Sequence, residues 1–190
     1  MRTSVLRQSA AFDFDAAVVK GCLDPASAAD SLFARAWRSG PASLTRTQRC
    51  RVAGVTGHVA ESVTELFLDR QSWRPLWHFS GPGQHGVDLV FLTPDDKVAA
   101  VEVKGTLVTG RIPRLSHREM TQMSAEWIDK TSNPAMVELG LHSFDIYGAV
   151  SAVNFADMTW RIAMTSDFSA LRPVTSAGQL ADLSWLNRGN

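Results

Sequence analysis

The sequence lacks the features that mark membrane, exported and disulfide-stabilised proteins. Its 190 residues include only two cysteines, Cys22 and Cys50, which form no CxxC pair and indicate neither a disulfide framework nor a zinc ribbon. No apolar run approaches the roughly 20 residues of a membrane-spanning helix. The chain also opens with no basic segment followed by an apolar one. We therefore expect a protein that acts in cytoplasm and makes no membrane contact.

Net charge is absent too, because 19 Lys and Arg balance 19 Asp and Glu. A protein that wraps duplex DNA by electrostatics alone needs a strong positive field, so any nucleic-acid contact must be local. Arg46, Arg49 and Arg51 form the one dense basic cluster, which fits a phosphate-backbone contact or a solvated helix face. Residues 86–150 hold nine acidic against six basic residues. This excess suits a pocket for divalent cations, although the solvated loop 94–96 accounts for part of it.

Apolar periodicity predicts two parts of the chain and an α/β fold. Residues 1–45 show short helical patterns at 12–19 and 26–37 and are interpreted as an N-terminal helical extension. Residues 46–190 mix both periodicities and are expected to form the main domain. In that domain the expected helices cover 55–69, 118–129 and 134–141, and the expected strands cover 73–79, 87–92, 97–103, 146–154 and 158–165.

Two of these strands bring charged residues together. The turn-rich connection 93–96 has the length expected in a hairpin. If Leu92 lies opposite Val98, the same antiparallel register places Asp88 opposite Glu102. Side chains alternate along a strand, so Glu102 and Lys104 share one face of the sheet.

Two carboxylates and one ammonium group therefore converge. A directly opposed Asp88–Glu102 pair repels, and a bridging divalent cation is the simplest thing that makes it favourable. Oxygen ligands without nearby His or Cys favour Mg²⁺ or Mn²⁺. Lys104 would hold a water molecule or stabilise charge on a phosphorus centre, which is the chemistry of phosphodiester cleavage. The competing interpretation is the ordinary solvated face of an antiparallel strand.

Asp88 followed by Glu102-Val103-Lys104 resembles the motif of the PD-(D/E)XK nuclease superfamily, whose members share the restriction-endonuclease-like fold. The resemblance covers about residues 52–165 and implies an αβββαβ core with a mixed sheet flanked by helices. It implies that Asp88 and Glu102 bind the metal, that the Val103 carbonyl completes the metal shell, and that Lys104 is the catalytic lysine. It also implies a carboxylate from the first helix. Glu61 is the expected one, and Glu65 is the alternative.

A narrower resemblance lies in Gln122-Met-Ser124 followed by Trp127-Ile128. These residues are similar to an element of nuclease domains in bacterial polymorphic and contact-dependent toxins. The resemblance implies that Gln122 contacts the scissile phosphate or the attacking water. It also implies an inhibitor (immunity) protein as partner and delivery into the cytoplasm of a target cell. A solvated helix residue is the competing interpretation of Gln122.

The leading hypothesis is a Mg²⁺- or Mn²⁺-dependent endonuclease that hydrolyses DNA, as a toxin or a defence enzyme. An RNase of the same fold that attacks tRNA is one alternative. A non-catalytic module that binds nucleic acid or protein is the other. Oligomeric state stays open, since no heptad or self-complementary patch is visible.

Overall fold

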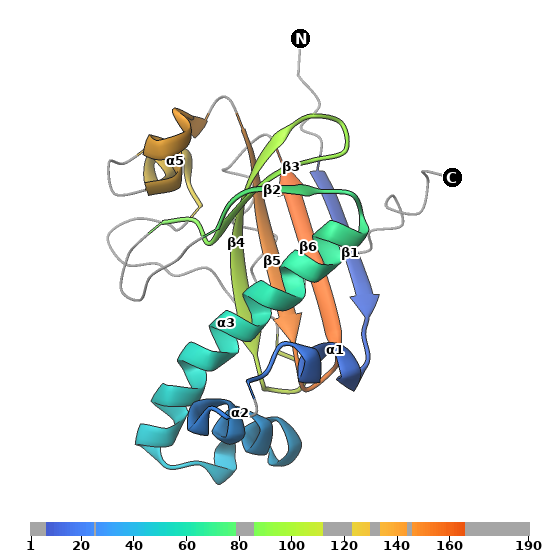
Figure 1. The fold of residues 1–190 in the computed structure, drawn as a ribbon, viewed down its shortest axis with the longest axis vertical. Coiled ribbons are helices and arrows are strands. Elements are labelled where there is room, and N and C mark those ends of the chain that lie inside the picture. The colour runs from blue at the N-terminus through green and yellow to red at the C-terminus, as the bar shows by residue number, and fades with distance from the viewer. Residues whose placement is uncertain are drawn as a thin grey trace.

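The computed structural model describes residues 7–24, 26–78, 86–111, 123–129, 134–143 and 146–165 (Figure 1). In chain order the elements are β1 (Arg7–Asp13), α1 (Ala16–Gly21), α2 (Ala28–Ser39), the 3₁₀ turn η1 (Pro41–Ser43), α3 (Arg46–Arg70), β2 (Arg74–His78), β3 (Leu89–Leu92), β4 (Val98–Thr106), α4 (Ala125–Asp129), α5 (Pro134–Leu139), β5 (Tyr147–Asn154) and β6 (Thr159–Thr165).

The strands form one six-stranded mixed sheet in the order β1-β6-β5-β4-β3-β2. β4 lies inside the sheet, antiparallel to β3 and parallel to β5, and every other neighbouring pair is antiparallel. The α/β class and the mixed sheet flanked by helices are thereby confirmed. Along the chain, α3, β2, β3, β4, α4 and β5 follow the order expected for the main domain, with α5 inserted before β5.

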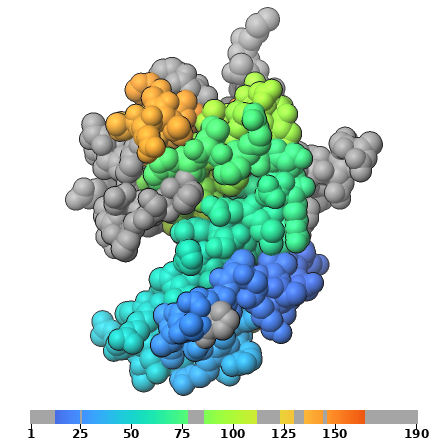
Figure 2. Space-filling model, viewed as in Figure 1, coloured from blue at the N-terminus to red at the C-terminus, as the bar shows by residue number. Residues whose placement is uncertain are grey.

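Two hydrophobic clusters hold helices against opposite faces of the sheet. The larger one joins α1, α2 and α3 to the odd-numbered residues of β4, such as Val101 and Val103. The smaller one joins α4 and α5 to even-numbered positions, such as Ala100 and Val150. Figure 1 shows α3 crossing the first face diagonally, and Figure 2 shows the blue-to-green segments covering much of the side turned to the viewer. Each face of β4 therefore packs against a different set of helices.

The helix α3 begins earlier than its apolar pattern predicted. Its first turns carry arginines, so periodicity gives no signal there, but Thr45 and Gln48 form a capping box that fixes the start at Arg46. Ser72, with φ of 62°, then ends the helix and turns the chain into β2. The long helix reaches from the α2 region to the strands of the predicted site.

Two other expectations need correction. Arg7–Asp13 is an edge strand paired with β6, so the first 45 residues are not purely helical; their helices are α1 and α2. Those residues also contribute Phe14 and Phe33 to the larger cluster that packs on the sheet. The division of the chain at residue 45 stays a prediction.

The helix expected over 118–129 does not extend through Met123, whose φ is 63°. The described helix starts after Ser124, whose hydroxyl accepts the backbone N–H of Trp127 as an N-cap does. Residues 118–122 and 180–186 lie outside the described part of the chain. No helix in the described ranges is long and apolar enough to span a membrane.

Candidate active site

Asp88 lies one residue before β3, where the hairpin register brings it to Glu102. The register pairs Leu92 with Val98 and Leu89 with Val101, as the sequence predicted. Asp88 Oδ2 accepts the backbone N–H of Val103 at 2.7 Å. The Asp88 carboxylate thus binds the backbone of β4 just beyond the last regular pair, Leu89 with Val101.

Glu102 and Lys104 share the face of β4 opposite to α3, because their neighbours Val101 and Val103 pack in the larger cluster. The Glu102 side chain is 1% exposed and that of Lys104 is 25% exposed. Lys104 Nζ donates a hydrogen bond to Glu102 Oε1. Burial of a carboxyl group inside a sheet costs folding free energy unless the group has hydrogen-bonding partners. Lys104 is such a partner for Glu102.

The two carboxyl groups interact strongly. The pKa of Glu102 is raised to about 8, first by burial and second by the charge of Asp88, while Lys104 opposes both. Burial also raises the pKa of Asp88, while the Val103 N–H and Lys104 lower it. A hydrogen bond between the carboxyls raises the pKa of Glu102 and lowers that of Asp88. In the metal-free protein the pair therefore holds a proton on Glu102 near neutral pH.

Glu61 approaches this pair from α3. Its side chain is 29% exposed, and His58 Nδ1 lies 3.9 Å from its Oε2. Burial raises the pKa of Glu61 first and the charge of Asp88 second, while His58 and, more weakly, Lys104 lower it. The charges of Asp88 and Lys104 therefore both act on Glu61.

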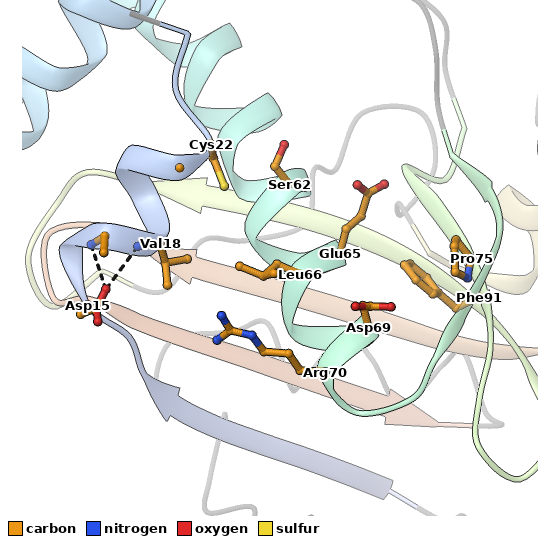
Figure 3. Close-up of a pocket in the computed structure, with 12 residues that line it drawn as sticks. Asp15, Val18, Cys22, Ser62, Glu65, Leu66, Asp69, Arg70, Pro75 and Phe91 are labelled. Carbon is orange, nitrogen blue, oxygen red and sulfur yellow. Dashed lines mark hydrogen bonds between the residues drawn. The ribbon is translucent and has the colours of Figure 1, made fainter.

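Glu65, the alternative helix carboxylate, faces elsewhere. It lines a pocket of about 860 Å³ between α1, α3 and the β2–β3 strands, shown in Figure 3 with Cys22, Ser62 and Asp69. Its charge raises the pKa of the Cys22 thiol, after burial of that group. Neither Asp88 nor Glu102 lines this pocket.

Gly105 is a site residue to which the sequence analysis gave no role. A Cβ at this position would lie 2.7 Å from the Thr56 carbonyl oxygen and 3.0 Å from Ala60 Cβ. The first distance is shorter than real Cβ contacts and the second is tighter than most of them, so glycine lets α3 pass this close to β4. A glycine directly after Glu102-Val103-Lys104 was the available signal, because glycine inside a strand marks a close backbone approach.

Gln122 lies outside the described residues, and its predicted role stays a prediction. Its neighbour Met123 is buried in the smaller cluster, on the face of the sheet that carries Glu102. The predicted Val103 ligand is a carbonyl oxygen, and its role too stays a prediction. Arg46, Arg49 and Arg51 are all exposed on the first turns of α3.

Asp88, Glu102 and Glu61 would offer carboxylate oxygens to a metal ion, and Mg²⁺ and Mn²⁺ prefer such oxygen ligands. A side-chain hydrogen bond joins the carboxyl groups of Asp88 and Glu102, and a cation bound between them would take the place of its proton. In the ranges that the structure describes, however, no three His, Cys, Asp or Glu residues gather closely enough to form a metal group. Asp88 and Glu102 are thus a close pair, and Glu61 a more distant neighbour.

Comparisons of the chain with protein-family models, with curated proteins and with solved structures found no match.

Proposed function

We propose that this protein is a metal-dependent nuclease that hydrolyses phosphodiester bonds of DNA, with Asp88, Glu102 and Lys104 as its centre. The observation that carries the proposal is the pairing of the half-buried Asp88, just before β3, with the buried Glu102, and a lysine on the same face of β4. A strand interior that holds Glu102 at 1% exposure beside a second carboxyl costs stability. Perturbed, coupled carboxyls of this kind cluster at functional sites.

Each residue has a role in the proposed chemistry. Asp88 and Glu102 would hold the cation, with the Val103 carbonyl as a further ligand and Glu61 binding from α3. A bound Mg²⁺ or Mn²⁺ would supply charge stabilisation on the phosphoryl oxygens and a more acidic water. Lys104 would leave its partner Glu102 to hold the attacking water or to stabilise charge on the phosphorus. Between the two helix carboxylates, the charge coupling of Glu61 to Asp88 supports Glu61.

We further propose membership of the PD-(D/E)XK superfamily. The order α3, β2, β3, β4, α4, β5 supports it, as does the parallel pairing of β4 with β5 after the crossover. The toxin branch, with an inhibitor protein as partner and Gln122 at the substrate, is the narrower proposal. It depends on residues 122–128, of which Gln122 lies outside the described part.

One observation favours a second candidate, the non-catalytic binding module. Within the described residues the carboxylates form a pair and not a group of three. In that case the Glu102–Lys104 pair would be a buried structural ion pair and Mn²⁺ would not bind. Calorimetric titration with Mn²⁺ separates the two candidates, since a nuclease site must bind the ion and a structural pair need not.

The substrate is tested by incubating the protein with supercoiled plasmid and, separately, with total tRNA, each with Mn²⁺ and with EDTA. We expect Mn²⁺-dependent nicking of plasmid and a loss of at least about 100-fold in rate for Lys104→Ala, as for removal of one transition-state donor. Cleavage of tRNA alone would reject DNA as the substrate. Plasmid nicking by Lys104→Ala at the wild-type rate would reject the site.

A further inference from the structure

A second cationic group lies on the same face of the sheet as the proposed catalytic residues. Lys104 pairs with Ala152 in β5, and Ala152 pairs with Arg161 in β6. Directly paired residues of neighbouring strands share a face, so Arg161 and Lys104 are on one side. Two strand spacings separate their backbones by roughly 10 Å. The half-buried Arg161 is therefore the next cation along this row of the sheet.

Arg161 lines a small pocket of about 90 Å³ at the end of this row. A second arginine, Arg111, reaches the pocket from the turn that follows β4. The remaining lining residues are Gly110, Ala152, Asn154, Asp157 and Thr159. Since a water molecule occupies about 30 Å³ in the liquid, the pocket has room for a group of a few heavy atoms.

Hydrogen bonds from the β5–β6 turn hold the Arg111 turn in place. Asn154, 6% exposed, donates through Nδ2 to the carbonyl oxygens of Val108 and Arg111, both at 3.1 Å. Asp157 Oδ2 accepts from the Gly110 N–H at 2.7 Å and from Asn154 Nδ2 at 2.7 Å. Gly110 has a φ of 68°, a conformation that glycine adopts without strain. The backbone of Arg111 is thus fixed before any ligand arrives, which lowers the entropic cost of binding.

The charge of the pocket suits an anion. Two arginines and one aspartate line it, and the aspartate carboxylate already accepts two hydrogen bonds. Among the residues that the structure describes, neither Arg111 nor Arg161 has a carboxylate within ion-pair distance. Guanidinium groups match the geometry of phosphate oxygens through paired N–H donors.

We propose that Arg111 and Arg161 form a phosphate subsite, which binds a backbone phosphate flanking the one that is cleaved at Lys104. This inference rests on the proposed nuclease function and adds the direction of the bound strand. The nucleic acid runs from the β3–β4 carboxyl pair across β5 toward β6 on the face opposite to α3. The exposed arginines at the start of α3 belong to the helix that packs on the other face of the sheet.

The test is fluorescence anisotropy with a fluorescein-labelled DNA oligonucleotide in EDTA, where metal-dependent cleavage is blocked. Arg111→Gln and Arg161→Gln are compared with wild type and with Arg38→Gln, which removes an exposed charge on α2. We expect each pocket variant to weaken binding by about tenfold, as for one lost charge-assisted hydrogen bond. The slope of log K against log salt should also fall by about 1 in each pocket variant and stay unchanged in Arg38→Gln.

Wild-type Kd and salt slope in both pocket variants would overturn the subsite, as would failure of the wild-type protein to bind DNA at low salt. Arg111 is exposed in a turn, so its variant decides the question even if Arg161→Gln does not fold. Failure of the nuclease proposal has a different signature. DNA binding that depends on the two arginines, without Mn²⁺-dependent cleavage, would reject the nuclease and support the subsite. Mn²⁺-dependent cleavage with DNA binding that does not depend on the arginines would support the nuclease and reject the subsite.

Discussion

Asp88 Oδ2 accepts a hydrogen bond from the backbone N–H of Val103 at 2.7 Å. This side-chain contact extends the β3–β4 pairing by one position, just before β3 begins. The bond fixes one carboxylate against the strand that carries Glu102 and Lys104.

Replacing Asp88 by Asn should stabilise the metal-free protein and abolish metal binding. The amide keeps an oxygen that can accept from Val103 but removes the charge that raises the pKa of Glu102. We expect a gain of about 1 kcal/mol, typical of relieving a strained functional site, measured by urea unfolding in EDTA. Asp69→Asn, an exposed carboxylate on α3, is the control and should change little. A clear loss of stability in Asp88→Asn would show that Asp88 is a structural residue.

The stability of the metal-free protein should fall as pH rises from about 4.5 to about 8. The folded-state pKa of Glu102 is about 8 and its ordinary value is 4.5, so the folded protein retains a proton that the unfolded chain loses. The contribution is fully present below pH 4.5 and is lost by about pH 8, with a slope of at most about 1.4 kcal/mol per pH unit. The measurement is the free energy of unfolding in EDTA for wild type minus that for Glu102→Gln. A difference that does not change between these pH values would contradict the buried carboxyl pair.

Adding Mn²⁺ should stabilise the wild-type protein at neutral pH. Binding to the folded state alone contributes about 2.7 kcal/mol at a free concentration 100 times the Kd. The shift in Tm should disappear in Glu102→Gln and persist in Glu126→Gln, which alters an exposed carboxylate on α4. Equal shifts in all three proteins would place the bound ion elsewhere.

Gly105→Ala should both destabilise the protein and lower its activity. The added methyl group would meet the Thr56 carbonyl oxygen at 2.7 Å, so α3 must move away from β4 and carry Glu61 with it. We expect a cost of about 1 to 3 kcal/mol, as for overpacking a close contact. Gly54→Ala is the matched control, because a Cβ there meets nothing within 4 Å and the helix should gain up to about 1 kcal/mol. Thermal unfolding of both variants checks the pair, and a Gly105→Ala protein as stable as wild type would refute the close approach.

The hairpin and the strand face of the site were predictable because strand alternation and antiparallel register are local rules. Leu92 opposite Val98 was enough to bring Asp88 to Glu102, and the structure has this register. The start of α3 and the edge strand β1 were not predicted from the hydrophobic pattern. The first turns of α3 are stabilised by a capping box, and β1 is stabilised by pairing with β6, which lies far away in the sequence.

The proposed phosphate subsite could not be predicted from the sequence. Arg111 and Arg161 are 50 residues apart in the sequence. They line one pocket because β5 lies between β4 and β6 and because Asn154, at the end of β5, binds the Arg111 carbonyl oxygen. Neither arginine belongs to a motif. Their proximity is a property of the sheet order, which no local pattern encodes.

The most direct test of the central claim is nicking of supercoiled plasmid by the wild-type protein and by Glu102→Gln, each in Mn²⁺ and in EDTA, with Glu126→Gln as the control. We expect nicking by wild type and Glu126→Gln in Mn²⁺ only, and a loss of at least about 100-fold in Glu102→Gln. Nicking by Glu102→Gln at the wild-type rate, or equal nicking in Mn²⁺ and EDTA, would contradict the central claim.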